Sequence, residues 1–167
     1  MIWECSHRYD PRAVRLADRH YSRQKPGTPQ FMKAGSCAVF YAEAGTGKAV
    51  WGTSWQRSEW VKHAWPGAWE CAIFRNEGVG KASTLIRQAV AATRAHYGAP
   101  PTPGMITFVD PSKVREKANP GHCFIIAGFR PAGHTAGGLL ALRLAPEDMP
   151  NAEPARWSQW SLFGEAA

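Results

Sequence analysis

The strongest constraint on the fold is a strand pattern that runs through a glycine-rich turn directly into a long helix pattern. Residues 68–76, AWECAIFRN, have the composition of a strand, and residues 81–97 carry apolar side chains at intervals of three and four. Between them, Gly78 and Gly80 permit a tight turn, and N–H groups at the start of a helix point toward an anion. The pattern favours an α/β domain with a phosphate-binding turn.

The turn does not fit the GxxxxGK[ST] loop of nucleotide hydrolases. Arg75 stands where the first glycine should be, and Ala82 replaces the magnesium-binding Ser or Thr after Lys81. A second stretch, AEAGTGKAV, fails in the same two ways, with Ala42 and Ala49. Neither segment is therefore expected to bind ATP or GTP.

The remaining patterns predict one α/β domain over residues 1–145 and a Pro-rich tail over residues 146–167. Asp10 is expected to cap the first helix, with Pro11 at its first position and Val14, Leu16 and Ala17 facing inward. Strands are predicted over 2–9, 36–43, 48–56, 68–76, 105–110 and 137–145, and helices over 11–21, 81–97 and 111–118.

Composition bounds the class of protein. A chain of 167 residues with 44% apolar residues is the size of one globular domain. No apolar run approaches the ~20 residues of a membrane span, and the N-terminus has no secretion signal pattern, so a cytoplasmic protein is expected. The four cysteines are scattered, which predicts buried free thiols.

The net charge of +7 suggests a polyanionic partner, although a merely solvated basic face is an equally good explanation. Basic residues are concentrated in residues 1–33, where seven Lys and Arg face three acids. If the partner is DNA, Arg23, Lys25 and Lys33, in the polar loop after the first helix, are expected to contact phosphates.

The segment RNEGVGKA, residues 75–82, resembles the pyrophosphate loop of the GNAT family, the GCN5-related N-acetyltransferases. Gly128-Phe129 is similar to the family's late YxxxGF element. The resemblance implies a central mixed, twisted β-sheet flanked by helices, and a donor phosphate held by Arg75, Gly78, Val79, Gly80 and Lys81. The alternative is a structural glycine turn with no ligand.

One position departs from the family pattern. The late tyrosine, which protonates the leaving thiolate in many such acetyltransferases, is replaced by Phe124. A phenyl ring cannot act as a general acid. Ordinary acetyl transfer is therefore expected to be lost or rerouted.

A second set of residues brings acid–base chemistry to the same fold. His20 and Tyr21 end the first helix pattern, Asp110 closes a buried strand, and Ser83 lies in the first turn of the long helix. Each has a structural explanation as well: a helix-end histidine, an N-cap before Pro111, and an ordinary helical serine.

Together, His20-Tyr21, the RxxGxG-like turn, Ser83 and the FVDP aspartate resemble the Mom-like branch of this fold, found in bacteriophages. That family is associated with converting adenine in phage DNA to a carbamoylmethyl derivative on its exocyclic amine, which blocks restriction enzymes. The resemblance implies catalytic roles for His20, Tyr21, Ser83 and Asp110, and a role for Arg75. It also implies double-stranded DNA and a small-molecule donor as partners; acetyl-CoA or a related donor is possible, and a metal is not excluded.

Tryptophans offer a place for an extruded adenine. Extruding a base costs a few kcal/mol, and stacking on aromatic rings returns ~1–3 kcal/mol per base. Trp51 and Trp69 lie on strands and are expected in the core, whereas Trp60 and Trp65 lie in a loop and are candidates for stacking.

Two other functions fit the same residues. An acetyl-CoA-dependent N-acetyltransferase acting on a small amine or an aminoacyl-tRNA would use the RxxGxG-like turn, but Phe124 counts against it. A non-catalytic DNA-binding module would use the basic charge and leave the glycine turn unexplained.

Overall fold

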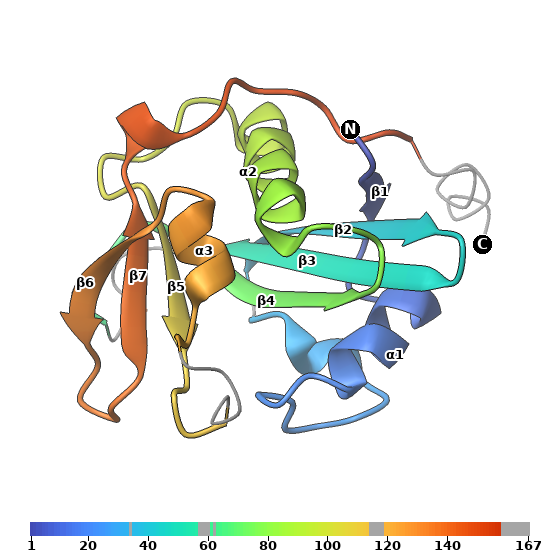
Figure 1. Ribbon diagram of the computed structural model, residues 1–167, viewed down its shortest axis with the longest axis horizontal. Coiled ribbons are helices and arrows are strands. Elements are labelled where there is room, and N and C mark those ends of the chain that lie inside the picture. The colour runs from blue at the N-terminus through green and yellow to red at the C-terminus, as the bar shows by residue number, and fades with distance from the viewer. Residues whose placement is uncertain (34, 57–60, 62, 114–118, 158–167) are drawn as a thin grey trace.

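Seven strands form one open, mixed sheet with helices on both faces in this computed structural model (Figure 1). The structure describes residues 1–33, 35–56, 61, 63–113 and 119–157. The strands are β1 (Glu4–Ser6), β2 (Ser36–Ala44), β3 (Gly47–Trp55), β4 (Trp69–Glu77), β5 (Met105–Val109), β6 (Arg130–His134) and β7 (Leu140–Leu144). The α-helices within the described ranges are α1 (Pro11–Asp18), α2 (Ala82–Tyr97) and α3 (His122–Ile126).

The sheet order is β1-β2-β3-β4-β5-β7-β6, and β4 and β5 are its parallel pair. Their pairing covers three residue pairs and ends at Cys71↔Thr107, although β4 continues to Glu77. A register shift at Gly52/Thr53 leaves Ala72 of β4 without a cross-strand partner in β3. Such a bulge bends its strand and re-aims the neighbouring side chains. The centre of the sheet therefore opens where β4 and β5 separate.

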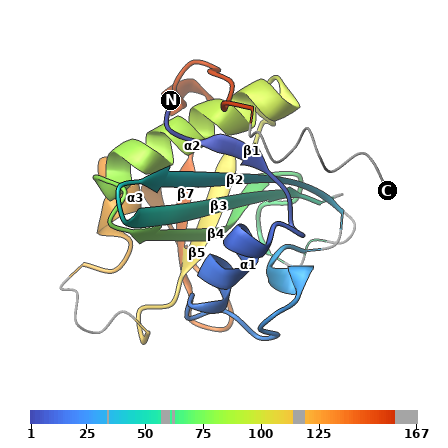
Figure 2. The same cartoon turned by 90° about the vertical axis from the view of Figure 1, so that its right-hand side faces the viewer.

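Each face of the sheet has its own core. Figure 2 shows α2 on one face of the sheet and α1 on the other. On the α2 and α3 face, Trp51 and Trp69 are fully buried, which confirms their predicted place in the core. On the α1 face, Leu16 packs among buried strand residues that include Val50 and Ile73. The sheet is thus a rigid platform between two apolar layers.

The N-terminal helix is shorter than its pattern predicts. Asp10 caps it as expected, accepting the Arg12 N–H at 2.9 Å, and Pro11 is its first residue. The prediction that it continues to residue 21 is wrong, because α1 ends at Asp18. Ala13 is buried in place of the predicted Val14, which is only partly buried.

Two elements near the C-terminal half were not predicted. Residues 121–129 include the short helix α3, and β6 follows it as an edge strand beside β7. Of the helix predicted over 111–118, residues 111–113 form a turn and the rest lies outside the described residues.

The described part of the C-terminal tail lies across α2 and returns to β1 (Figure 1). Arg94 of α2 donates to the carbonyl of Pro150 at 2.6 Å, and the Glu153 N–H donates to the carbonyl of Ala91 at 3.2 Å. The Arg156 N–H then donates to the carbonyl of Trp3, and the Arg156 carbonyl accepts the Cys5 N–H. No helix among the described residues is both long and apolar enough to cross a membrane.

Candidate functional site

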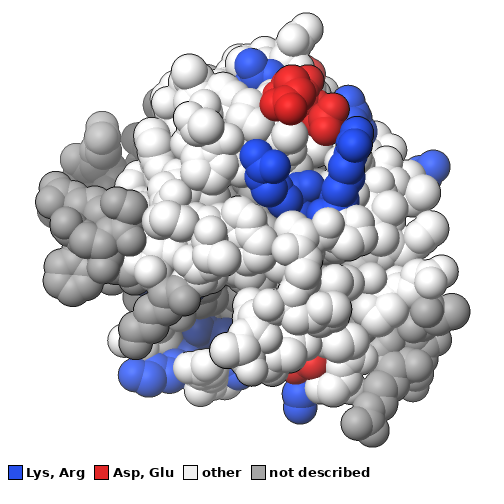
Figure 3. Space-filling model, turned by 90° about the vertical axis from the view of Figure 1, so that its left-hand side faces the viewer, with Lys and Arg blue, Asp and Glu red and all other residues white. Residues whose placement is uncertain are grey.

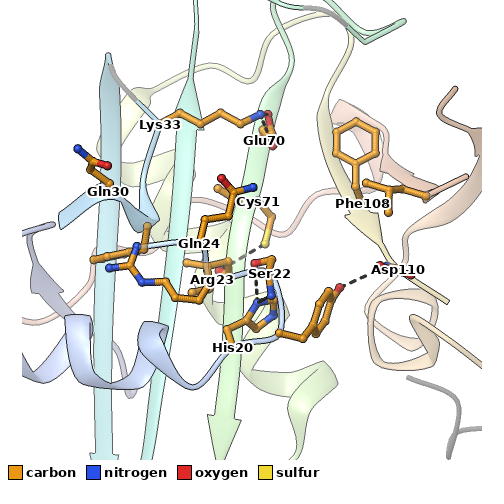
Figure 4. Close-up of a pocket in the computed structure, with 15 residues that line it drawn as sticks. His20, Ser22, Arg23, Gln24, Gln30, Lys33, Glu70, Cys71, Phe108 and Asp110 are labelled. Atoms are coloured by element: carbon orange, nitrogen blue, oxygen red, sulfur yellow. Dashed lines mark hydrogen bonds and ion pairs between the residues drawn. The ribbon is translucent and has the colours of Figure 1, made fainter. Parts of the chain in front are cut away.

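A cavity of about 660 Å³ opens where β4 and β5 separate, on the side of the sheet that carries α1 (Figure 4). The segment after α1 forms one wall, from His20 to Gln24, and β4 contributes Cys71 and the bulged Ala72. Phe108 and Asp110 lie on the β5 side. The volume is typical of a small-molecule or nucleobase site.

Three of the predicted catalytic residues meet in this cavity. The rings of His20 and Tyr21 stack with their centroids 4.4 Å apart. The Tyr21 hydroxyl accepts the backbone N–H of Asp110 at 3.3 Å, across 89 residues of sequence. The segment after α1 and the residue after β5 thus bring their polar groups to one place.

His20 is a neutral imidazole in this environment. Its Nδ1 accepts the Ser22 N–H at 3.3 Å and lies 2.7 Å from the Ser22 hydroxyl. Burial, and then the nearby Arg75 charge, lower the pKa of His20 to about 4. Because Nδ1 accepts a backbone hydrogen bond, the ring proton sits on Nε2. His20 therefore offers a hydrogen-bond donor to the cavity at neutral pH.

Asp110 and Tyr21 differ in protonation: the carboxyl is ionised and the phenol is neutral. The Asp110 Oδ1 accepts the Ser112 hydroxyl at 2.6 Å and the Ser112 N–H at 2.9 Å, and these bonds lower the pKa of the carboxyl. Asp110 is consequently an ionised acceptor at the mouth of the cavity. Burial raises the pKa of the Tyr21 phenol, which therefore keeps its proton. The arrangement presents two donors beside a carboxylate.

Ser83 is not part of this arrangement. It is buried in the first turn of α2 and is not among the residues that line the cavity. Phe124, at the position of the missing tyrosine, is buried in α3, where its ring packs against Phe74 and Phe129 with centroids 6.0 and 5.3 Å away. Position 124 thus belongs to the core.

The glycine turn is ordered by side chains of its own strand. Asn76 accepts the Val79 N–H at 3.0 Å and donates to the Gly80 carbonyl at 2.8 Å. Gly78 has φ of +85°, a conformation that favours glycine. Lys81 is the exposed N-cap residue of α2 and makes no side-chain capping bond. The first turn of α2 therefore presents N–H groups that no capping side chain covers.

The hydrogen bonds of Arg75 lie within the protein, which does not favour its predicted role in holding a donor phosphate. Its Nε donates to Glu77 at 2.6 Å, and its Nη1 donates to the carbonyl of Arg19 at 2.6 Å. Arg19 also holds Glu77, at 2.6 Å, and these bonds lower the pKa of Glu77 to about 2. Arg75 thus joins the end of α1 to the end of β4 and lies within electrostatic range of His20.

The side chains predicted to contact DNA differ in whether they are already bonded within the protein. Arg23 is used internally: it donates to Asp18 at 2.6 Å, and its side chain is only 4% exposed. Lys25 is exposed, whereas the Lys33 ammonium bonds to Glu70. Trp65 is partly buried in a loop, and Trp60 lies outside the described residues. Lys25 and Trp65 therefore remain the better candidates.

The face at the β6 edge carries little continuous positive charge. Figure 3 shows Lys and Arg side chains beside acidic ones in its upper part, uncharged surface across its middle, and further Lys and Arg side chains at its lower edge. At this edge Arg130 of β6 lies 3.6 Å from Asp148. Basic and acidic side chains thus balance one another locally at this edge.

A buried carboxylate in the cavity wall was missed from the sequence. Glu70 of β4 is 7% exposed and lines the cavity together with Lys33. The signal that could have found it is a charged residue inside an otherwise apolar strand, because Glu is rarely buried without a partner.

Neither a metal cluster nor a known relative identifies the site. Within the part of the chain that the structure describes, no group of three or more His, Cys, Asp or Glu side chains is placed to hold a metal ion. The four cysteines are free thiols, and of these Cys71 is buried. No protein family, curated protein or solved structure matches this chain.

Proposed function

We propose that this chain is a DNA-modifying transferase that places a small, carbamoylmethyl-like group on the exocyclic amine of adenine. The observation that carries the proposal is the convergence of His20, Tyr21 and Asp110 on one cavity of about 660 Å³. These are three of the four residues to which the Mom-like resemblance assigns catalysis. The fourth, Ser83, is left without a chemical role.

The residues present suit an aromatic amine as the acceptor. Such an amine is a weak nucleophile, because its lone pair is delocalised into the ring, so positioning and proton removal both matter. Donors at His20 Nε2 and the Tyr21 hydroxyl would hold acceptor atoms of the base or the donor molecule. As the new N–C bond forms and the donor's leaving group departs, the Asp110 carboxylate would take the amine proton and release it to water.

The opening between β4 and β5 supports a second ligand, the group donor. The parallel pair ends at Cys71↔Thr107, and α2 begins directly after the glycine turn with no side-chain cap. An anionic group of the donor would suit these N–H groups. A strand, a glycine turn, this helix and then a buried strand are also the order that the GNAT resemblance leads one to expect.

An acetyl-CoA-dependent N-acetyltransferase is the second candidate, since the same opening and turn would suit that donor. The buried Phe124 leaves it without a general acid at the usual position.

Mass spectrometry of nucleosides from the DNA of bacteria expressing the chain tests the proposal. We expect a modified deoxyadenosine that is missing in cells with an empty vector. An unmodified adenine profile together with acetyl-CoA turnover by the purified protein would replace the proposal with the acetyltransferase. Unmodified adenine without turnover, but with DNA binding, would reduce the protein to a binding module.

A further inference from the structure

Glu70 lies at the junction of two cavities. It lines the first cavity, and its partners Lys33 and His63 line a second one of about 590 Å³. Lys33, Phe108 and Leu139 border both, so the two cavities adjoin beside the Glu70–Lys33 pair. Figure 4 shows this pair facing the side of the cavity that carries Phe108.

The two members of the pair differ in how firmly they are held. Glu70 belongs to the central strand β4, and its side chain is 9% exposed. Lys33 follows the short 3-10 helix Pro29–Phe31, and its side chain is 45% exposed. One ammonium contacts both carboxylate oxygens, at 2.7 and 2.6 Å. The solvated lysine side chain can turn away, whereas the carboxylate on the strand cannot follow it. Because a buried carboxylate without a partner is costly, a group that displaces Lys33 must itself donate to Glu70.

His63 approaches the same carboxylate from the second cavity. Its Nδ1 accepts the Trp65 N–H at 3.1 Å, so the proton of the neutral ring is on Nε2. That Nε2 lies 3.8 Å from Glu70, and burial lowers the pKa of His63. Glu70 is therefore held between a removable cation and a neutral donor that is too distant for a full hydrogen bond.

We propose that Glu70 recognises the amino group of the substrate's heterocycle, and that Lys33 is the partner which the substrate displaces. This inference rests on the proposed function. Carboxylates accept hydrogen bonds from the exocyclic amines of bases, and a neighbouring donor suits the adjacent ring nitrogen. An exocyclic amine carries two hydrogens, so Glu70 can accept one of them and leave the other free.

The ring of such a substrate has aromatic neighbours at this junction. His63, Trp65 and Phe108 form a cluster with centroids 5.2 to 6.2 Å apart. Trp65 and Phe108 are only partly buried and line the second cavity. Offset stacking on one of these faces would orient the edge of the heterocycle toward Glu70.

Binding to two matched duplexes tests this role without donor or turnover. One G·C-rich duplex carries a single adenine opposite an abasic site, which makes extrusion easy. The other carries purine, which is the same ring without the amino group, in its place. We expect the protein to bind the adenine duplex roughly 10- to 100-fold more tightly by fluorescence anisotropy, as a hydrogen bond to a charged group allows.

Substitutions assign that preference to its residue. Glu70→Ala should bind both duplexes equally, and Lys33→Met should keep or increase the preference because it removes the competing ammonium. Glu147→Ala, an exposed carboxylate far along the chain, is the matched control and should bind as the wild type does. If Glu70→Ala fails to fold, the isosteric Glu70→Gln should still lose most of the preference.

Equal binding of the two duplexes by the wild type, or a preference that survives in the Glu70 variants, would overturn the inference. Adenine modified in cells by a protein without the preference would overturn this inference alone. A preference that depends on Glu70, with no modified adenine in cells, would instead leave the amine site standing and remove the transferase.

Discussion

At the scale of single residues, neighbours decide what each side chain can do. His20 was a candidate base, but two donors from Ser22 surround its Nδ1 and burial lowers its pKa to about 4. It is therefore better suited to donate a hydrogen bond than to take a proton. Hydrogen bonds from Ser112 lower the pKa of Asp110, so it is a charged acceptor, and in the proposed mechanism it would hold the amine proton only briefly.

The His20 shift predicts how stability depends on pH. The folded pKa, about 4, lies below the ordinary value of 6.5, so the unfolded chain binds the proton more readily between these values. Its contribution to stability is thus complete above pH 6.5 and is lost as the pH falls toward 4. Urea denaturation at several pH values should show a shallower loss for His20→Gln, and an unchanged pH dependence would contradict this assignment.

At the scale of elements, the glycine turn and the opening of the sheet would form the donor side of the proposed site. The two glycines of the turn have different constraints. A side chain at Gly80 would meet nothing within 4 Å, whereas Gly78 has φ of +85°. A Cβ on Gly47 would lie 2.4 Å from the Gly78 carbonyl group, so the β2–β3 hairpin fixes the turn from behind.

These constraints separate folding from ligand binding. Gly80→Val should keep the wild-type melting temperature and lose activity, because its side chain blocks only an approaching ligand. Gly78→Val should lose roughly 1–2 kcal/mol of stability from the left-handed backbone conformation. Thermal melting and modified-adenine yield check both. A folded Gly80→Val protein with full activity would make the turn purely structural.

Sequence patterns predicted which helices and strands form more accurately than they predicted where each one ends. The strand, turn and helix over residues 68–97 follow from local periodicity, and so does the Asp10 cap. The end of α1 does not follow from periodicity, because the Asp18 carboxylate accepts hydrogen bonds from Arg23 and from the Gly27 N–H in the loop after the helix. The Glu70–Lys33 pair was equally hidden, since it joins residues 37 positions apart.

At the scale of the whole molecule, the net charge of +7 leads us to predict electrostatic binding to DNA. Several basic side chains are already used within the fold, such as Arg23 on Asp18 and Arg75 on Glu77. Such pairs contribute nothing to the net charge, so under the proposed function exposed lysines such as Lys25 would be the ones to contact phosphates.

Salt dependence of DNA affinity measures that contact. Affinity should fall linearly on a log-log plot, and Lys25→Ala should reduce the slope by about 1. Arg23→Ala should instead lower the melting temperature, because its side chain is 4% exposed and bonded to Asp18. Salt-independent binding would remove the electrostatic argument.

The most direct measurement is the yield of modified adenine from Asp110→Asn and Tyr21→Phe, with thermal melting as the folding control. Asn retains the turn-capping ability of Asp, and Phe retains the ring that stacks on His20. If these groups act on the substrate amine, Asp110→Asn should lower the yield roughly 10²- to 10⁴-fold. Tyr21→Phe should lower it as well, and Asp148→Asn, an exposed control, should not. Near wild-type yield from both site variants, with the fold intact, would contradict the account.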